Sequence, residues 1–264
     1  MSARAKKPGA ASGRGRPKAA DVPVALVTGS AKRLGKEIAL RLAGLGYFTW
    51  VHYLSSRPEA EEALSVIRAA GGAGALVKGD MASRSDVSAM AAKLGKASGR
   101  VDVLVNNVGI YRKGDLLTYE VEDFEATLRA NLTGAFQLIR ECLPLFGKGG
   151  SIVNIGYAGI ENLTASVEAT AYLISKSGLF ILTKSLAQAL GSRGVRVNMV
   201  SPGILSNSVE LPQRPRDWVP LGRLGECADV CDAVEFLVGK RASYVTGVNL
   251  DVAGGYMLSL DGLD

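Results

Sequence analysis

The sequence contains few of the residues that build metal centres and disulfide scaffolds. Its 264 residues include one histidine, His52, and three cysteines, Cys142, Cys227 and Cys231, whose spacing matches no metal-binding pattern. We therefore expect neither a zinc site nor a disulfide scaffold, and so few cysteines favour a reducing, cytoplasmic compartment. The chain also lacks an apolar run long enough to span a bilayer, which predicts a protein without membrane contact.

Acidic residues are absent from the first 20 positions, whose six basic residues account for the whole formal net charge of +6. The rest of the chain holds 25 basic and 25 acidic residues and is neutral. We predict that residues 1–21 form a disordered basic tail, because they contain almost no large apolar side chain. The tail also lacks a hydrophobic core region, which argues against a secretory signal.

The tail segment SGRGRPKAA, residues 12–20, resembles an AT-hook. In such a motif Arg14 and Arg16 would enter a narrow A·T-rich minor groove, and Lys18 would meet a phosphate. Tails rich in glycine, proline and arginine are also common by chance, so DNA contact is the less favoured interpretation.

From Val22 onward, short apolar segments alternate with amphipathic segments. Apolar strands that alternate with helices indicate a parallel sheet covered on both faces. We therefore predict one α/β domain over residues 22–264, a doubly wound, Rossmann-type fold with a seven-stranded parallel sheet. The predicted strands lie at 22–29, 47–54, 74–80, 101–107, 151–156, 195–200 and 247–252. The predicted helices lie at 33–46, 57–72, 83–99, 122–145, 169–190 and 227–238.

The first strand is followed by the turn TGSAKRLG, Thr28 to Gly35, which opens a helix. Gly29 allows a tight turn and the close approach of a phosphate, and the helix start offers free N–H groups and the positive end of a dipole. The simpler alternative is a strand-to-helix loop in which Ser30 is only a capping residue. The position of the turn in an alternating chain favours a dinucleotide site.

The end of the second strand indicates which dinucleotide is bound. A carboxylate there would bind the ribose hydroxyls of NAD. The sequence instead offers Ser55, Ser56 and Arg57, with no acid before Glu59. Two further cations, Lys32 and Arg33, lie in the first turn, so we predict that the site accepts a 2′-phosphate and that the cofactor is NADPH rather than NADH. The alternative is that Ser55 and Arg57 belong to a solvated helix start.

Five short motifs in a fixed order resemble the classical short-chain dehydrogenase/reductase family over about residues 22–258. They are TG with a downstream glycine at 28–35, NNVG at 106–109, NLTG at 131–134, Tyr172-x-x-x-Lys176, and PG at 202–203. Any one of them is weak, but the ordered set is specific. The resemblance implies a homotetramer or homodimer that acts on a small-molecule substrate.

The resemblance also implies roles for individual residues. The cofactor phosphates would be lined by Gly29, Arg33, Leu34 and Gly35, and the adenine would be contacted by Asp80 and Met81. The cofactor ribose would be flanked by Asn107, Val108 and Gly109, and the nicotinamide would be contacted by Pro202, Gly203 and Ile204. Asn131 matches an asparagine that supports a proton relay.

Two features of the chain resemble pteridine reductases in particular. Arg33 stands where the family usually has glycine, and the turn TGSAKRLG is similar to theirs. Those enzymes carry an aromatic residue shortly after the NNA motif that stacks on the pterin, and Tyr111 occupies the matching place.

Tyr172 and Lys176 lie one helical turn apart and therefore on one face of the predicted helix. A tyrosine ordinarily has a pKa of about 10. A nearby ammonium and an oxidised nicotinamide both favour the phenolate, which would make Tyr172 a usable general acid near neutral pH. Asn131 is a poor helix former in the middle of a predicted helix, and such inconsistencies cluster at functional sites.

Tyr157 stands where the family has a serine that holds the substrate carbonyl, three residues after the strand asparagine Asn154. Counting back from Tyr172 by the family's usual spacing gives Gly159 instead, so the loop after Tyr157 is interpreted as two residues longer than usual. Three readings stay open: Tyr157 donates its own O–H, it stacks on a substrate ring, or the site is degraded. Pteridine reductases have an aspartate here, which counts against simple assignment to that group.

We therefore predict an NADPH-dependent reductase of a carbonyl or C=N group, with pterin-like and 3-oxoacyl substrates as the two leading classes. Tyr172, Lys176, Asn131 and Tyr157 are the predicted catalytic residues, and Tyr111 and Tyr157 the predicted substrate contacts. Ser30, Tyr172 and Lys176 are also predicted to contact the cofactor. The alternative is an NADPH-binding sensor without turnover, tethered to DNA by its tail.

Overall fold

The computed structural model describes residues 18–19, 21–208, 211, 214 and 217–257. Arg14 and Arg16 lie outside the described residues, so their proposed DNA contact stays a prediction, as does the division into a tail over 1–21 and a domain over 22–264. The seven strands form one parallel sheet in the order β3-β2-β1-β4-β5-β6-β7, which confirms the doubly wound fold. Their bounds are β1 Val24–Val27, β2 Phe48–Tyr53, β3 Ala73–Lys78, β4 Val101–Asn106, β5 Phe146–Ile155, β6 Arg196–Pro202 and β7 Asn249–Val252.

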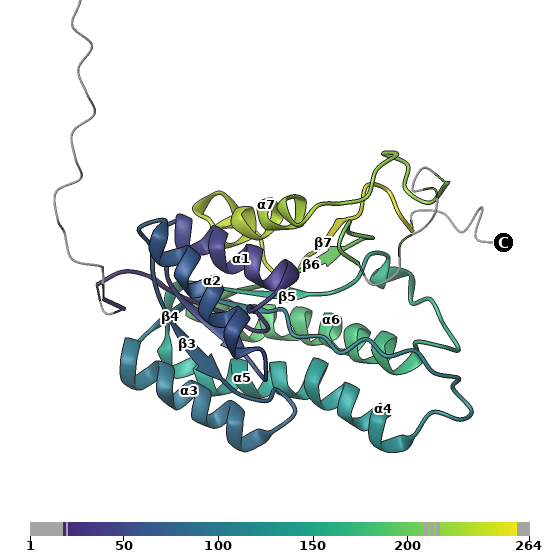
Figure 1. Cartoon of the computed structure of the whole chain (residues 1–264), viewed down its shortest axis with the longest axis horizontal. Coiled ribbons are helices and arrows are strands. Elements are labelled where there is room, and N and C mark those ends of the chain that lie inside the picture. Colours follow the sequence, from purple (N-terminus) through teal and green to yellow (C-terminus); the bar gives the residue numbers. More distant parts are fainter. Residues whose placement is uncertain (1–17, 20, 209–210, 212–213, 215–216, 258–264) are drawn as a thin grey trace, which may run out of the picture.

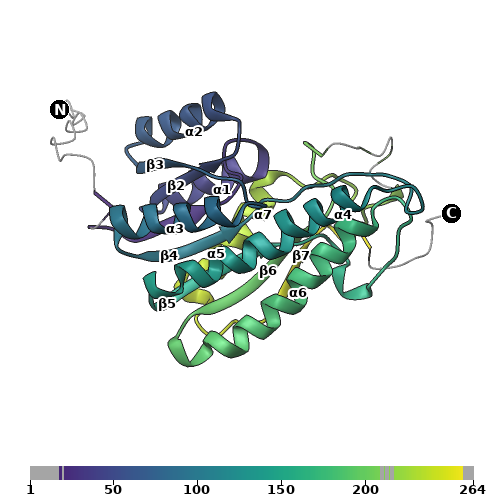
Figure 2. The same cartoon turned by 90° about the horizontal axis from the view of Figure 1, so that it is seen from below.

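Helices cover both faces of this sheet (Figure 1). One face carries α1 (Arg33–Gly44), α2 (Arg57–Ala69) and α7 (Cys227–Val238). The other face, turned toward the viewer in Figure 2, carries α3 (Arg84–Ser98), α4 (Val121–Leu128), α5 (Gly134–Cys142) and α6 (Thr170–Leu190). Each side of the sheet therefore has its own apolar core layer, and large residues such as Leu26, Ile38, Leu104 and Ile152 are completely buried.

The predicted helix over 122–145 is interrupted in the structure. A five-residue π-helical segment, Arg129–Thr133, separates α4 from α5. Gly134 follows it and packs so tightly on the Met81 carbonyl that a β-carbon there would overlap the oxygen. Such wide turns are rare and occur often at functional sites, and this one contains Asn131. Asparagine is a poor helix former, so the sequence signal at Asn131 agrees with the break in the helix.

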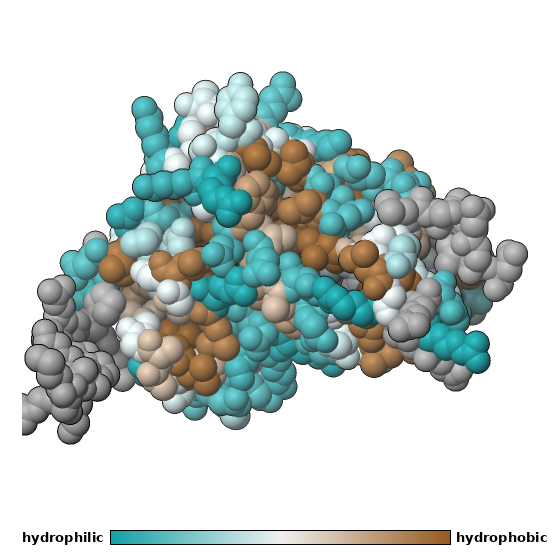
Figure 3. Space-filling view, turned by 90° about the horizontal axis from the view of Figure 1, so that it is seen from above, coloured by the Kyte–Doolittle hydropathy of each residue, from teal (hydrophilic) through white to brown (hydrophobic). Residues whose placement is uncertain are grey.

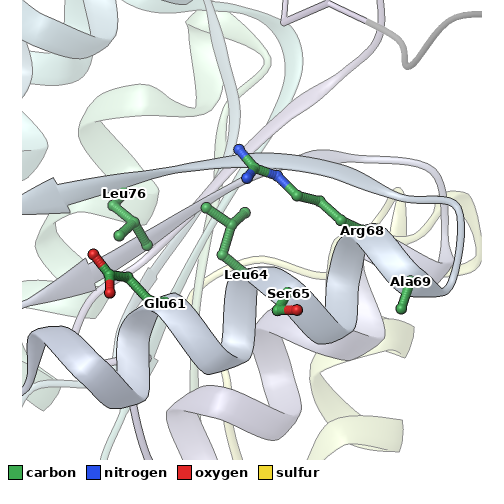
Figure 4. A pocket seen from close by; sticks show the side chains of 6 residues that line it. All are labelled: Glu61, Leu64, Ser65, Arg68, Ala69 and Leu76. Carbon is green, nitrogen blue, oxygen red and sulfur yellow. The ribbon is translucent and has the colours of Figure 1, made fainter.

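The outer surface near α1, α2 and α7 has two features, a mixed polarity and a hollow. Over α1 and α7 it mixes hydrophilic residues with hydrophobic patches (Figure 3). A hollow of about 560 Å³ lies beside α2 and the edge strand β3, lined by Glu61, Leu64, Ser65, Arg68, Ala69 and Leu76 (Figure 4). It contains none of the predicted site residues, so it is not the candidate site.

None of the helices within the described ranges is long and apolar enough to cross a membrane.

Candidate active site

The predicted site residues gather at the carboxyl ends of the central strands. β1 and β4 are neighbours, and the chain continues from β1 toward β2 on one side and from β4 toward β5 on the other. The crevice at such a reversal of strand order is the ordinary ligand site of doubly wound sheets. The turns after β1, β4, β5 and β6 carry Gly29, Asn107, Tyr157 and Gly203.

The first turn is shaped by two glycines. Gly29 has a φ of +63°, in the left-handed region that favours glycine. A β-carbon on Gly35 would overlap the Gly29 carbonyl oxygen and lie 3.0 Å from its carbon. The start of α1 therefore lies directly against the turn, which leaves a cradle of backbone at the positive end of the helix.

The turn after β4 supports the same cradle. The Asn107 N–H and the Val108 N–H donate to Thr28 Oγ1 over 2.9 and 3.1 Å. The Asn107 side chain donates through Nδ2 to the Thr28 carbonyl at 2.9 Å and lies 3.2 Å from that of Gly29. Its amide group is therefore occupied in holding the first turn. Gly109 is exposed, and a β-carbon there would be 3.2 Å from Lys176 Nζ.

The predicted cations differ in whether they form ion pairs with acidic side chains. Lys32 forms an ion pair of 2.6 Å with Glu59, and Arg57 forms one of 2.8 Å with Glu61. The exposed Arg33 forms no ion pair with any described residue, and its φ of +50° lies in the left-handed region. This backbone conformation explains why glycine is the easier residue at that position.

The other predicted cofactor residues have distinct surroundings. Ser55 is exposed, while Ser56 precedes α2 without a side-chain cap. Asp80 accepts from the Ala82 N–H at 2.8 Å, whereas Met81 is buried in the core beside the π-helical segment. Leu34 packs against the core layer under α1.

Gly35→Ala is expected to destabilise the fold and to abolish cofactor binding, because the new methyl group overlaps the Gly29 backbone as well as the Asn107 side chain. The matched control is Gly44→Ala in the same helix, where no described residue outside the helix's own backbone comes within 4 Å of the new carbon. It is expected to raise stability by up to about 1 kcal/mol. Thermal unfolding and NADPH fluorescence titration of both variants measure this. Equal behaviour of the two variants would contradict it.

Lys176 is the most buried charged group in the described part of the chain, at 2% exposure. Its Nζ donates to the Ile155 carbonyl over 2.7 Å and lies 6.0 Å from the centre of the Tyr172 ring. Burial lowers the pKa of Lys176 from 10.5 to about 8. Burial also raises the pKa of Tyr172 above its ordinary value, with Tyr111 and Tyr157 adding to the rise. In the chain alone, burial thus outweighs the lowering expected from the ammonium.

Asn131 connects the π-helical segment to the loop after β4 and to helix α6. Its Oδ1 accepts from the Ile110 N–H at 2.7 Å, and its Nδ2 lies 3.0 Å from both the Ile110 carbonyl and Ser175 Oγ. Ser175 in turn donates to the Tyr172 carbonyl at 2.7 Å. This chain of bonds fixes the helix that carries Tyr172, and nothing in the sequence had singled out Ser175.

Tyrosines surround Tyr172. Tyr111 packs edge-on against it with ring centres 5.0 Å apart, and Tyr157 is tilted at 6.0 Å. The Tyr157 hydroxyl is buried and has no hydrogen-bond partner among the described residues. Tyr256, which the sequence analysis missed, is half-buried and interacts electrostatically with Tyr111. The site is therefore aromatic on several sides.

Hydrogen bonds join two pairs of loops near the site. The loop after β4 pairs with the loop before α6, where the N–H groups of Gly114 and Leu116 donate to the carbonyls of Glu168 and Val167 at 2.9 Å. Asn162 Nδ2 donates to the Met257 carbonyl at 3.0 Å, which ties the last described segment to the long loop after Tyr157.

The turn after β6 lies beside both β5 and β7. The Pro202 carbonyl accepts from the Ala158 N–H at 2.9 Å, and the Gly203 N–H donates to the Val252 carbonyl at 3.0 Å. Gly203 packs on Ala253, and Ile204 is half-buried. The structure thus brings the predicted nicotinamide contacts to the edge at which Tyr157 emerges.

This fold, with a backbone cradle at the strand reversal and a buried Tyr–Lys pair, defines a Rossmann-type oxidoreductase. The model of the family described as enoyl-(acyl carrier protein) reductase matches residues 29–257. The chain belongs to this short-chain dehydrogenase/reductase family.

Relatives and solved structures agree with this assignment. The chain is 34% identical over 239 residues to the 3-oxoacyl-[acyl-carrier-protein] reductase FabG of Staphylococcus aureus, which covers 88% of this chain and 96% of the relative. It is similar to a blue fluorescent protein from a metagenomic library in complex with NADPH, with a TM-score of 0.84, 32% identity, and coverage of 90% and 98% of the two chains. It is also similar to the landomycin C-6 ketoreductase LanV with bound NADP and rabelomycin, with a TM-score of 0.82, 29% identity, and coverage of 90% and 97%.

Proposed function

We propose that the protein is an NADPH-dependent reductase of a carbonyl or C=N group on a ring-containing substrate, with Tyr172 as proton donor. The observation that carries the proposal is the arrangement around Tyr172. The buried Lys176 Nζ lies 6.0 Å from its ring centre, and the rings of Tyr111 and Tyr157 pack against it. Hydrogen bonds from Asn131 through Ser175 reach its carbonyl. The protein is proposed to act in the cytoplasm.

The backbone cradle fits a dinucleotide, because the close packing of Gly35 on Gly29 brings the positive end of α1 against the turn. The phosphates that join its two halves would be held by Gly29, Arg33, Leu34 and Gly35. The 2′-phosphate would be held by Arg33 together with Ser55, Ser56 and Arg57. Asp80 and Met81 would border the adenine, Asn107, Val108 and Gly109 the ribose, and Pro202, Gly203 and Ile204 the nicotinamide. When bound, NADPH supplies a hydride. The NADP and NADPH complexes of similar structures support this cofactor.

The protein's own task in the reaction is to supply a proton and to orient the acceptor. A raised pKa keeps Tyr172 protonated at neutral pH, which is the form that a proton donor needs. Lys176, with a pKa of about 8, carries positive charge at neutral pH and favours the phenolate that Tyr172 becomes on donating its proton. Asn131 holds the surrounding backbone.

The aromatic walls favour a flat ring as substrate, because tyrosine faces stack on π systems. Tyr111 is 46% exposed, packs against Tyr172 and is the proposed stacking residue. The second candidate is a 3-oxoacyl thioester, favoured by the 34% identity to 3-oxoacyl reductases. Steady-state assays with dihydrobiopterin and with an acetoacetyl thioester distinguish the two. Tyr111→Ala should raise KM for a ring substrate and leave KM for the thioester unchanged.

Arg33→Gly is expected to lower the preference for NADPH over NADH by about tenfold, which corresponds to the loss of one charge-assisted contact of 1.5 kcal/mol or so. The glycine also accepts the left-handed conformation of this position, so the fold should persist. Arg57→Ala is the matched comparison: Arg57 already forms an ion pair with Glu61, so its removal should lower the preference for NADPH less than the removal of Arg33 does. Dissociation constants for both dinucleotides measure the effect, and an unchanged ratio in Arg33→Gly would remove Arg33 from the 2′-phosphate site.

A homodimer or homotetramer is proposed because large apolar residues lie exposed along α5 and α6. Phe136, Ile174 and Ile181 are 41%, 46% and 64% exposed. Sedimentation velocity tests this, and a monomer at micromolar concentration would contradict it.

A further inference from the structure

His52, the one histidine of the chain, joins the ends of three strands. It lies in β2 and is 1% exposed. Its Nδ1 is 2.8 Å from the Gly29 N–H donor at the end of β1, and its Nε2 is 2.9 Å from the Gly79 carbonyl at the end of β3. An N–H only donates and a carbonyl only accepts, so the ring must be the neutral tautomer with its hydrogen on Nε2.

The backbone of His52 forms two further hydrogen bonds with the same turn. The His52 N–H donates to Ser30 Oγ and the Ser30 N–H donates to the His52 carbonyl, both over 2.9 Å. Ser30 Oγ then donates to the Val27 carbonyl at 2.7 Å. Ser30 is completely buried, so its hydroxyl serves the turn rather than a ligand. Together these bonds fix the first turn to β2.

We propose that His52 is a positioning residue for the cofactor, because it holds the phosphate-binding turn at Gly29 and the adenine-side loop that begins at Gly79 in one arrangement. The role rests on the proposed NADPH-dependent function. His52 does not touch the reacting atoms. It acts through Gly29, whose N–H it occupies, and through Gly79, which precedes the predicted adenine contacts Asp80 and Met81.

The ring is neutral over the pH range in which such an enzyme works. Burial lowers the pKa of His52 to about 4, against smaller raising effects of the hydrogen bond to Gly79 and of the charge of Asp80. Asp80 is the charged group that acts on the ring among the described residues. Protonation would place a hydrogen on Nδ1 facing the Gly29 N–H, and the bond would be lost.

The tautomer gives a test on the unmodified protein. Long-range ¹H–¹⁵N spectra contain a single imidazole, since the chain has one histidine. At pH 6 the expected pattern is a protonated Nε2 and a bare Nδ1, whereas an ordinary histidine would be mostly charged there. A hydrogen on Nδ1, or a charged ring at pH 6, would overturn the proposal whether or not any variant folds.

Two variants test the role itself. His52→Phe keeps the ring volume and loses both hydrogen bonds, and we expect its dissociation constant for NADPH to rise about tenfold. His52→Asn keeps an acceptor near the place of Nδ1 and should bind within about threefold of the wild type. KM for NADPH should rise in His52→Phe while kcat at saturating NADPH stays unchanged.

Each contrary result has one meaning. A folded His52→Phe variant with unchanged NADPH affinity, or equal weakening in His52→Phe and His52→Asn, would reduce His52 to a structural residue and overturn its positioning role alone. Failure of the wild type to bind NADPH would overturn the proposed function and this role with it.

Discussion

Tyr172→Phe is expected to lower kcat by about 10³-fold while NADPH still binds, because the variant loses the proton that the reduced substrate must receive. The phenyl ring keeps its packing against Tyr111 and Tyr157, so the fold should persist. Stopped-flow absorbance at the nicotinamide band measures turnover, and fluorescence titration measures binding on the same samples.

Tyr157→Phe is the matched control, since it removes a neighbouring tyrosine hydroxyl. That hydroxyl is buried and has no hydrogen-bond partner in the part of the chain that the structure describes, so its removal should leave stability unchanged or raise it by about 1 kcal/mol. Turnover that survives Tyr157→Phe and disappears in Tyr172→Phe identifies Tyr172 as the donor. If Tyr157→Phe loses as much activity as Tyr172→Phe, Tyr157 shares the proton transfer. Full activity of Tyr172→Phe would contradict the mechanism.

Lys176→Met is expected to lower kcat/KM by at least about 100-fold, because the buried ammonium stabilises the charge that develops on Tyr172. Methionine is close to lysine in volume, so it fills the space left by the side chain. The variant also loses the bond to the Ile155 carbonyl, which does not depend on substrate. Steady-state kinetics at saturating NADPH measure the first effect.

The same variant has a distinct signature in the pH dependence of stability. The native pKa of Lys176 is about 8 and its ordinary value 10.5, so between these values the unfolded chain binds more protons. Stability of the wild type should therefore rise with pH from 8 to 10, by up to about 1.4 kcal/mol per pH unit from this group.

Lys176→Met should lack this contribution to the slope. Lys184→Met, on the exposed side of the same helix, is the control and should keep it. Urea unfolding at pH 8, 9 and 10 measures the slopes. Parallel slopes in the wild type and Lys176→Met would show that Lys176 is not a buried charge.

The fold could be predicted because its signal is local. Seven apolar segments that alternate with helical segments allow one kind of sheet, and the carboxyl ends of the strands then lie at one edge. The break in the predicted helix over 122–145 could not be predicted in the same way. The π-helical segment depends on how Gly134 packs against the Met81 carbonyl, which is a contact between distant parts of the chain.

The site was predictable where motifs mark it and not where tertiary contacts make it. Tyr172 and Lys176 share a helix face at a fixed spacing, so their proximity follows from sequence. Tyr256 and His52 reach the site only through the folding of the last segment and of β2. Burial also reversed the expected direction of the Tyr172 pKa in the chain alone, because the depth of a side chain is not a local property.

The most direct test of the account is to add NADPH to the purified protein, confirm binding by fluorescence, and then add dihydrobiopterin or an acetoacetyl thioester while following nicotinamide absorbance. We predict that NADPH binds more tightly than NADH and is oxidised when at least one of these substrates is present. Tight binding of NADPH with no oxidation by either substrate would contradict the reductase mechanism and favour a sensor without turnover.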